Sequence, residues 1–350
     1  MALVPPHTHP RHEHPQYVPV ADLGTNPIFT GRNRIINGDF SVNQRAFTSA
    51  TTDTTYGFDR WLLGKSGGTV TYSTQAPALG ELSESARAFA RVVTSGQSAA
   101  GDYAILSQRI ESVRTLSGKT ATVSFWAKAA VGAPKVAVEV EQNFGTTGSP
   151  SGAVQTYAGQ VTLSTSWARY SISVAVPSIA GKTLGTAGND FVSIALWTSA
   201  GSTFNARTGS LGIQSATIDI WGVQVEEGSV ATLFEQKSYA DELRACQRYY
   251  ERRDCMMNNG QDIMAVCYNS AVPAIGTWQY MVPKRTAPTI SYPTNGGARY
   301  VNTGGGASSG LTMTTSVNRN IYAAVLATST NQTASAGWFD NFVVEASAEL

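Results

Sequence analysis

The feature that most constrains this chain is a repeated alternation of apolar and polar residues. Valines occupy every second position of 136–140, and the segments 170–176 and 218–225 repeat the pattern. Successive side chains of an extended strand point to opposite faces, so each segment offers one face to a core and one to solvent. The β-branched and aromatic run at 123–127 has the same preference. These segments predict β-strands.

Clusters of Gly, Asn, Ser and Pro separate these segments, as at 145–152 and 185–190. Short alternating strands between such turns are typical of an antiparallel sandwich or jelly roll. We therefore predict an all-β fold, with a β-jelly-roll sandwich over 33–236 and a small C-terminal β-sandwich over 257–350. The second unit has about 90 residues, a size that is marginal alone and better supported in an oligomer.

Late strands are expected at 321–326 and 338–344, where aromatic and β-branched residues return. Glycine-rich stretches lie between 294 and 310, which predicts exposed loops at the end of the C-terminal unit. Any binding contacts of this unit are expected first in such loops, although glycines this dense also suit a flexible connection.

One segment departs from the strand pattern. Half of the residues in 239–254 are charged, and Tyr239, Leu243, Cys246 and Tyr250 are spaced 4, 3 and 4 apart. This spacing forms a stripe on a helix, so we predict a helix over 239–254 within a connecting segment 237–256. Its stripe could form a three-stranded seam between copies, or pack on its own jelly roll as a hinge.

Composition excludes several classes of protein. Charged residues make up 14% of the chain and the net charge is +1, so no excess of Lys and Arg exists to neutralise nucleic-acid phosphates. No apolar stretch approaches the roughly 20 residues of a membrane span, and the first residues lack the pattern of a signal peptide. Three cysteines without CxxC spacing predict reduced thiols, with neither a disulfide framework nor a zinc ribbon.

Four stretches resemble phage tail-fibre and tail-tip receptor-binding proteins. Residues 33–40, followed by 57–61, resemble the opening strand of their carbohydrate-binding-module-like jelly rolls, and 221–235 resemble the closing strand. Residues 242–250 are similar to the helix that follows that domain, and 282–289 to an early strand of the tip domain.

This resemblance implies a homotrimeric virion component, assembled in the host cytoplasm, that contacts other tail or baseplate proteins. It also implies that the protein binds a host surface glycan or protein.

The N-terminal segment 1–32 contains all four histidines, His7, His9, His12 and His14, as two HxH motifs. On an extended chain each pair points one way, and three chains would offer six nitrogens, an octahedral site that suits iron or nickel. The resemblance supports a bound transition metal, because HxH motifs have this use in trimeric phage fibres. The alternative is a solvated attachment arm. The neighbouring prolines favour a polyproline II conformation, in which the two histidines of a pair would not point in the same direction.

Aromatic residues are the candidates for glycan contacts, because pyranose C–H faces stack on aromatic rings. Trp126 and Trp221 lie within strands, and we interpret both as core residues. Each of the candidates could also be structural. They are Phe144, Tyr157, Trp197 and Phe204 in the jelly roll, and Trp278, Tyr292, Tyr300 and Trp338 in the C-terminal unit.

Asn37, Asp39 and Glu226 are candidates for a structural calcium site, since calcium takes oxygen ligands and these residues lie near the first and last strands. The alternative is an Asx turn and ordinary solvated acids.

Catalysis is not expected. No histidine lies outside the arm, which excludes a Ser-His-Asp triad in the β units. Glu226 and Glu227 are adjacent and face opposite sides of a strand, whereas Glu139 and Glu141 share a face that we expect to point to solvent. We therefore expect a non-catalytic adhesive protein. The alternatives are a glycan-binding module of a bacterial cell-wall or secreted enzyme, and a purely structural tail-tip subunit.

Overall fold

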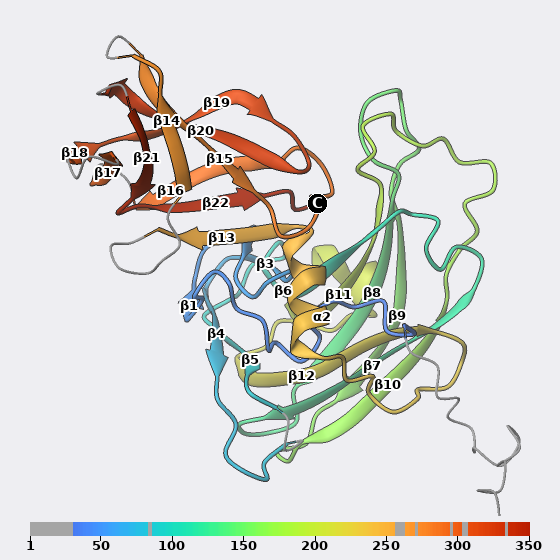
Figure 1. Cartoon of the computed structure of the whole chain (residues 1–350). Coiled ribbons are helices and arrows are strands. Elements are labelled where there is room, and N and C mark those ends of the chain that lie inside the picture. Colours follow the sequence, from blue (N-terminus) through green and yellow to red (C-terminus); the bar gives the residue numbers. More distant parts are fainter. Residues whose placement is uncertain are drawn as a thin grey trace, which may run out of the picture.

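The computed structural model describes residues 31–82, 86–255, 263–269, 272–294, 297–302, 307–332 and 335–350. The described chain is built from antiparallel β-strands in four sheets, with one helix of two turns at the junction between its two halves (Figure 1). This confirms the predicted all-β class. The histidine arm lies outside the described residues.

Two six-stranded sheets form the jelly roll. Sheet A has the order β1-β4-β5-β12-β7-β10, with the bounds β1 Ser49–Ala50, β4 Thr69–Gln75, β5 Phe89–Ser95, β12 Ala216–Glu227, β7 Thr120–Ala129 and β10 Ala168–Ala175. Sheet B has the order β2-β3-β6-β11-β8-β9, with the bounds β2 Thr55–Tyr56, β3 Leu62–Ser66, β6 Tyr103–Glu111, β11 Phe191–Ala200, β8 Lys135–Asn143 and β9 Val154–Thr162.

The core of the jelly roll lies between these sheets and follows the alternation of the sequence. Val123 and Phe125 of β7 and Ile218 and Ile220 of β12 belong to one buried cluster with the valines of β8. The predicted strands at 123–127, 136–140 and 218–225 fall within β7, β8 and β12, and the one at 170–176 extends one residue beyond β10.

The opening segment lies beside the second half of β12, because the Arg34 amide donates to the Val225 carbonyl at 2.8 Å and the Val223 amide donates to the Gly38 carbonyl at 2.9 Å. The segments 33–40 and 221–235 therefore lie side by side.

Helix α2 spans Tyr239–Gln247 and is shorter than predicted. Ser238 caps its first turn, since its side chain accepts a hydrogen bond from the Asp241 amide. The chain then turns at once into β13 (Tyr250–Asp254), because Tyr250 pairs with Ser347 of the last strand. The predicted helix over 239–254 is wrong in its second half, where pairing with a distant strand overrides the local pattern.

The predicted seam between copies is wrong for Cys246 and Tyr250, whereas for Tyr239 and for half-buried Leu243 it stays a prediction. Cys246 is fully buried, Tyr250 belongs to β13 and is buried, and Tyr239 is exposed. The Glu242 carboxylate, which is buried, accepts a hydrogen bond from the Asn37 amide at 3.0 Å. The helix therefore packs on its own jelly roll, which was the alternative.

Two further sheets form the C-terminal unit. Sheet C has the order β13-β22-β16, with the bounds β22 Val343–Ser347 and β16 Thr289–Thr294. Sheet D has the order β18-β17-β21-β14-β15-β20-β19, with the bounds β18 Ala307–Leu311, β17 Ala298–Asn302, β21 Ser335–Asp340, β14 Ile263–Cys267, β15 Pro273–Gln279, β20 Ala323–Asn331 and β19 Met313–Arg319. The unit therefore begins at β13, before the predicted boundary at 257.

Two details of this unit correct the sequence prediction. The strand expected at 338–344 is two strands, because Asn341 takes a left-handed conformation (φ 62°) and turns the chain between them. The stretch 294–310 contains the strands β17 and β18, so it is not one long loop. Residues 295–296 and 303–306, with most of its glycines, lie outside the described residues.

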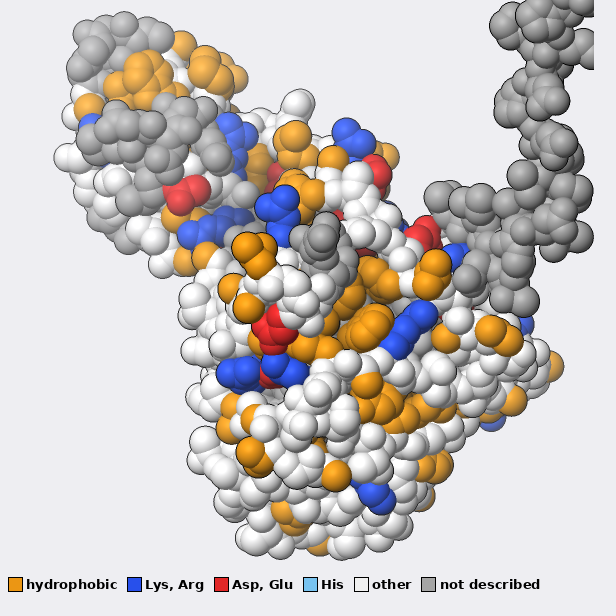
Figure 2. All heavy atoms as spheres, turned by 90° about the horizontal axis from the view of Figure 1, so that it is seen from below, with side chains coloured by type: hydrophobic (Ala, Val, Ile, Leu, Met, Phe, Trp, Pro, Cys, Tyr) orange, Lys and Arg blue, Asp and Glu red, His pale blue; other side chains and the backbone are white. Residues whose placement is uncertain are grey.

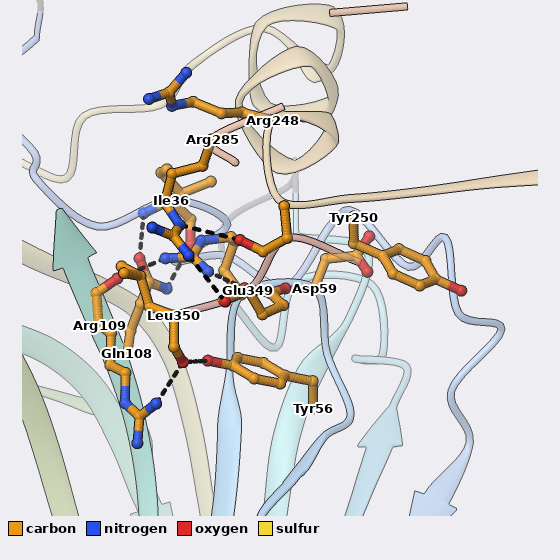
Figure 3. A network of polar contacts seen from close by, with 12 residues as sticks. Ile36, Tyr56, Asp59, Gln108, Arg109, Arg248, Tyr250, Arg285, Glu349 and Leu350 are labelled. Carbon is orange, nitrogen blue, oxygen red and sulfur yellow. Dashed lines mark hydrogen bonds and ion pairs between the residues drawn. The ribbon is translucent and has the colours of Figure 1, made fainter. Parts of the chain in front are cut away.

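The last residues return to the jelly roll and connect the two units (Figure 3). The Glu349 carboxylate pairs with Arg45 at 3.1 Å and also with Arg60. The main-chain oxygen of Leu350 accepts a hydrogen bond from the Tyr56 hydroxyl at 2.8 Å. We call the ionic part of this contact, Arg45, Asp59, Arg60 and Glu349, the junction cluster.

The three cysteines are free and buried, as predicted. Among the described residues, no helix has the length and apolar character needed to cross a membrane.

Candidate glycan-binding surface

Three tryptophans from neighbouring strands meet on the outer face of sheet A. Trp126 of β7 lies directly opposite Trp221 of β12, and Trp167 precedes β10 on the other side of β7. With Glu81 and Leu82 they line a hollow of about 310 Å³. Figure 2 looks at the side where β12, β7 and β10 lie in Figure 1, and it shows hydrophobic side chains gathered in a hollow beside charged ones.

The position of these indoles follows from strand geometry. Phe125 and Ala127 face the core, so Trp126 between them must face outward. Trp221 likewise follows the inward Ile220. Gly222 then adopts φ 62°, and the register between β12 and β7 shifts there. A Cβ on Gly222 would approach the Trp126 ring at 3.1 Å, so a glycine keeps the space beside that ring open.

The rings differ in exposure, and this difference assigns their roles. Trp221 is 3% exposed, and its ring centroid lies 5.2 Å from that of Phe234. Trp126 and Trp167 are half-buried, and Phe89 supports Trp167 edge-on at 5.3 Å. Trp221 therefore forms the floor, whereas Trp126 and Trp167 have accessible faces. Within the described part of the chain, the buried Trp221 Nε1 has no hydrogen-bond acceptor.

Ion pairs lie beside the aromatic surface, and the opposite charges within them neutralise each other. The Arg91 guanidinium donates to both Asp219 oxygens at 2.7 and 2.9 Å. The Lys128 amine bonds the Glu81 carboxylate and lies 3.8 Å from Asp219. The Trp167 Nε1 also donates to Glu81, at 3.0 Å. Glu81 thus fixes the orientation of the Trp167 ring.

The hydrogen bond from Lys128, with those from the Ala78 amide and the Trp167 indole, lowers the pKa of Glu81 to about 2. A general acid needs a raised pKa, so Glu81 is unsuited to protonate a glycosidic oxygen. Asp219 is held by Arg91. This surface can stack and hydrogen-bond a ligand, but its carboxylates are not arranged for hydrolysis.

The lowered pKa of Glu81 predicts that the free energy of unfolding decreases at acid pH. Glu81→Gln should remove this part of the pH dependence. The carboxylate is ionised in the folded state down to about pH 2, whereas the unfolded carboxyl titrates near ~4.3. Its contribution to stability is therefore complete above the unfolded pKa and is lost as the pH falls toward 2. We expect the difference in unfolding free energy between the wild type and Glu81→Gln, measured by urea denaturation, to be constant from pH 8 to about 5 and to shrink below. A difference independent of pH would contradict the role of Glu81.

Several aromatic residues predicted to bind glycan are buried, and a buried ring cannot stack on a sugar. Trp197 is fully buried on the outer side of sheet B, where its Nε1 donates to Glu139 at 3.0 Å. The Arg207 guanidinium bonds the same carboxylate at 2.6 and 2.9 Å and lies 4.9 Å from the Trp197 ring. The predictions for Phe144, Trp197, Trp278 and Tyr300 are therefore wrong.

The other candidates retain some exposure but do not meet at one place. Tyr157 on β9 is 37% exposed, whereas half-buried Phe204 packs against Trp197 at 5.1 Å. Phe204 belongs to a short 3₁₀ turn that leads into α1 (Asn205–Thr208), which covers this end of sheet B. Tyr292 and Trp338 are half-buried in the C-terminal unit, on different sheets. These four stay predictions.

Asn37, a predicted calcium ligand, makes hydrogen bonds within the protein. Its fully buried amide donates to the carbonyls of Val42 at 2.9 Å and Asp59 at 3.0 Å, and its oxygen accepts from the Val42 amide at 2.9 Å. The side chain fixes the turn at the start of the jelly roll.

Glu226 is likewise satisfied within the protein. It accepts hydrogen bonds from the Thr232 amide and hydroxyl at 2.9 and 2.6 Å, and from the Gln224 amide at 2.8 Å. Asp39 accepts from the Ser41 amide at 3.2 Å, the geometry of an Asx turn. In the described ranges, no group of three or more His, Cys, Asp and Glu side chains is placed to hold a metal ion. The calcium hypothesis gains no support from these residues.

The tryptophan surface was not predicted from the sequence, although the strand pattern contains a signal for it. Trp126 and Trp221 are out of phase with the apolar positions of their own strands, so alternation assigns them to the outer face. Their size and apolar neighbours suggested core packing instead. The contribution of Trp167 and Glu81 depends on tertiary contacts between segments far apart in the chain.

No family model and no curated protein sequence matches the chain. Solved structures to which it is similar include carbohydrate-binding modules. The family 11 module from Clostridium thermocellum, in complex with a β-1,3-1,4-mixed-linked tetrasaccharide, is 13% identical, covers 53% of this chain and 99% of its own, and has a TM-score of 0.31. The CBM22-2 xylan-binding domain from Paenibacillus barcinonensis is 14% identical, covers 52% and 100%, and has a TM-score of 0.32. A CBM4 structure is 19% identical, covers 55% and 98%, and has a TM-score of 0.31. At these identities the likeness concerns the fold alone.

Proposed function

We propose that this protein binds a glycan without catalysis, through the tryptophan surface of sheet A formed by Trp126, Trp167 and Trp221. The observation that carries the proposal is the convergence of three indoles, from β7, β12 and the residue before β10, two of them accessible and one forming the floor. A sugar presents an apolar C–H face to such rings and hydroxyl groups at its edge. A hollow with apolar walls and a few fixed polar groups is the usual form of a small-ligand site.

The charges around this surface favour an uncharged sugar. Two cations, Arg91 and Lys128, face two carboxylates, Glu81 and Asp219, and each is held in an ion pair. An acidic sugar would have to break one of these pairs to gain a partner. Three adjacent strands span about 10 Å across the sheet, so the surface accommodates a short segment of a chain.

The biological setting that we propose rests on the sequence resemblance. It supports a phage tail-fibre or tail-tip receptor-binding subunit, located in the virion, trimeric, and attached to other tail proteins through the histidine arm. The arm would hold iron or a similar metal only if its histidines face one another across chains. Several copies of a weak glycan site would raise overall avidity through effective concentration.

The function is tested by measuring binding of the full-length protein to a panel of neutral and acidic oligosaccharides, followed by calorimetry on the best ligand. We expect Trp126→Ala to weaken binding about 30-fold, the effect of removing a central aromatic contact worth about 2 kcal/mol. Trp126→Phe should recover part of the affinity, since it restores an aromatic face.

Tyr157→Ala is the matched control, because Tyr157 is an exposed aromatic residue on the outer face of the other sheet. Unchanged affinity in Trp126→Ala would contradict a binding site on sheet A. If Tyr157→Ala lost affinity instead, the binding site would lie on sheet B. Absence of binding to any oligosaccharide would overturn glycan binding and favour a structural tail-tip subunit.

A further inference from the structure

The tryptophan surface of sheet A holds one carboxylate whose hydrogen-bonding capacity is not fully used. Glu81 Oε1 accepts hydrogen bonds from the Lys128 amine and, at 3.0 Å, from the Trp167 indole, and Oε2 accepts one from the Ala78 amide at 2.8 Å. An ionised carboxylate has about four acceptor sites, so these partners from the described chain leave one site on Oε2. The side chain is 26% exposed and lines the hollow, so a bound molecule can reach it.

The floor of the same hollow carries the complementary group. Trp221 is 3% exposed, and no described residue accepts a hydrogen bond from its Nε1. Buried polar groups of folded proteins are almost always paired, because an unpaired one costs free energy. The hollow is the open space that this indole lines, so an acceptor for the N–H group can enter there.

A spare acceptor and a spare donor in one hollow match a hydroxylated molecule. A hydroxyl group both donates and accepts, whereas a carboxylate only accepts and an indole N–H only donates. The volume of about 310 Å³ is at the lower end of the range for small-molecule sites. Stacking on Trp126 and Trp167 uses the C–H face of a pyranose, which sugars with differently placed hydroxyls share. Selection among such sugars therefore needs the polar groups of the hollow.

We infer that Glu81 and Trp221 determine which sugar residue this surface selects, a role that rests on the glycan binding proposed above. One hydroxyl of the sugar donates to Glu81 Oε2, and the oxygen of another accepts from Trp221 Nε1. A sugar that lacks either hydroxyl leaves a polar group of the hollow unpaired, and such sites reject analogues strongly. The substrate class is a neutral sugar, because Glu81, with a pKa of about 2, stays ionised and repels a carboxylate.

The test is calorimetry of the full-length protein with the methyl glycosides of glucose, galactose and mannose and with their monodeoxy analogues. For the preferred glycoside, we expect removal of either of two hydroxyls to weaken binding to the wild type about 10-fold or more. In Glu81→Gln the loss for one of these hydroxyls should shrink to about 3-fold, since a hydrogen bond to a charged group is roughly twice as strong as a neutral one. Trp221→Phe should abolish the loss for the other hydroxyl.

A purely structural role of Glu81 would give a different result. If Glu81 only oriented the Trp167 ring, Glu81→Gln would weaken all of the analogues by the same factor, and this outcome would overturn the inference. Monofluoro analogues check the direction of each hydrogen bond, because fluorine accepts weakly and cannot donate. Fluorine in place of the hydroxyl that donates to Glu81 should be as damaging as hydrogen, whereas at the hydroxyl bonded by Trp221 it should be less damaging.

Glu227→Gln is the matched control, because Glu227 is an ion-paired carboxylate of β12 that does not line the hollow. Its affinity and its discrimination among the analogues should equal those of the wild type. If Trp126→Ala lost affinity while neither Glu81→Gln nor Trp221→Phe changed the discrimination, the inference would fail and the proposed glycan site would stand. A wild type that bound an oligosaccharide but none of these methyl glycosides, up to their solubility, would also contradict selection of a single sugar residue.

Discussion

Glu349→Ala is expected to lower the free energy of unfolding by about 3–5 kcal/mol, because it leaves a buried arginine without its counter-ion. The Arg60 side chain is 1% exposed, pairs with Glu349, and lies 3.4 Å above the Tyr249 ring. Burial lowers the pKa of Arg60, but the nearby Glu349 carboxylate raises it, and the pKa of Arg60 stays above its ordinary value. The effect is measured by urea denaturation.

Glu227→Ala is the control for this measurement. Glu227 pairs with Lys119 at 2.6 Å, but both side chains are about half exposed. Such surface pairs contribute about 0–1 kcal/mol. If Glu349→Ala were no more destabilising than Glu227→Ala, the junction cluster would not hold the two units together, and Arg60 would be solvated in solution.

Trp197→Ala is expected to cost about 3–5 kcal/mol of stability, the range for deleting a fully buried large aromatic side chain. The ring fills the space between sheet B and the segment that contains α1, and its loss also removes the indole donor of Glu139. Burial raises the pKa of Glu139, and the ion pair with Arg207 offsets part of this increase. Thermal and urea unfolding measure the loss.

The same variant separates a core role from a binding role. Glycan affinity of folded Trp197→Ala should equal that of the wild type, because the ring has no exposed surface. Trp197→Phe should lose less stability, since it retains most of the ring volume. Full stability together with lost glycan binding in Trp197→Ala would return Trp197 to the list of sugar contacts.

The sequence by itself determined the all-β class and which side chains share a face. Alternation is a local property of an extended backbone, so it places Phe125 and Trp126 on opposite faces of their strand, although we interpreted Trp126 as a core residue. The junction helix was recognisable for the same reason, through the 4, 3 and 4 spacing of its stripe and its many charged residues. Its end was not, because β13 begins where Tyr250 meets Ser347, nearly one hundred residues later.

Only the tertiary structure decided which outward-facing residues remain accessible. Trp126 and Trp197 occupy equivalent phases of their strands, yet the segment with Arg207 and α1 covers Trp197 and no such segment within the described residues closes over Trp126. The partners of Arg60 and Trp167, which are Glu349 and Glu81, are likewise distant in the chain. Local spacing fixes the direction of a side chain, but what lies above it depends on long-range packing that the spacing does not encode.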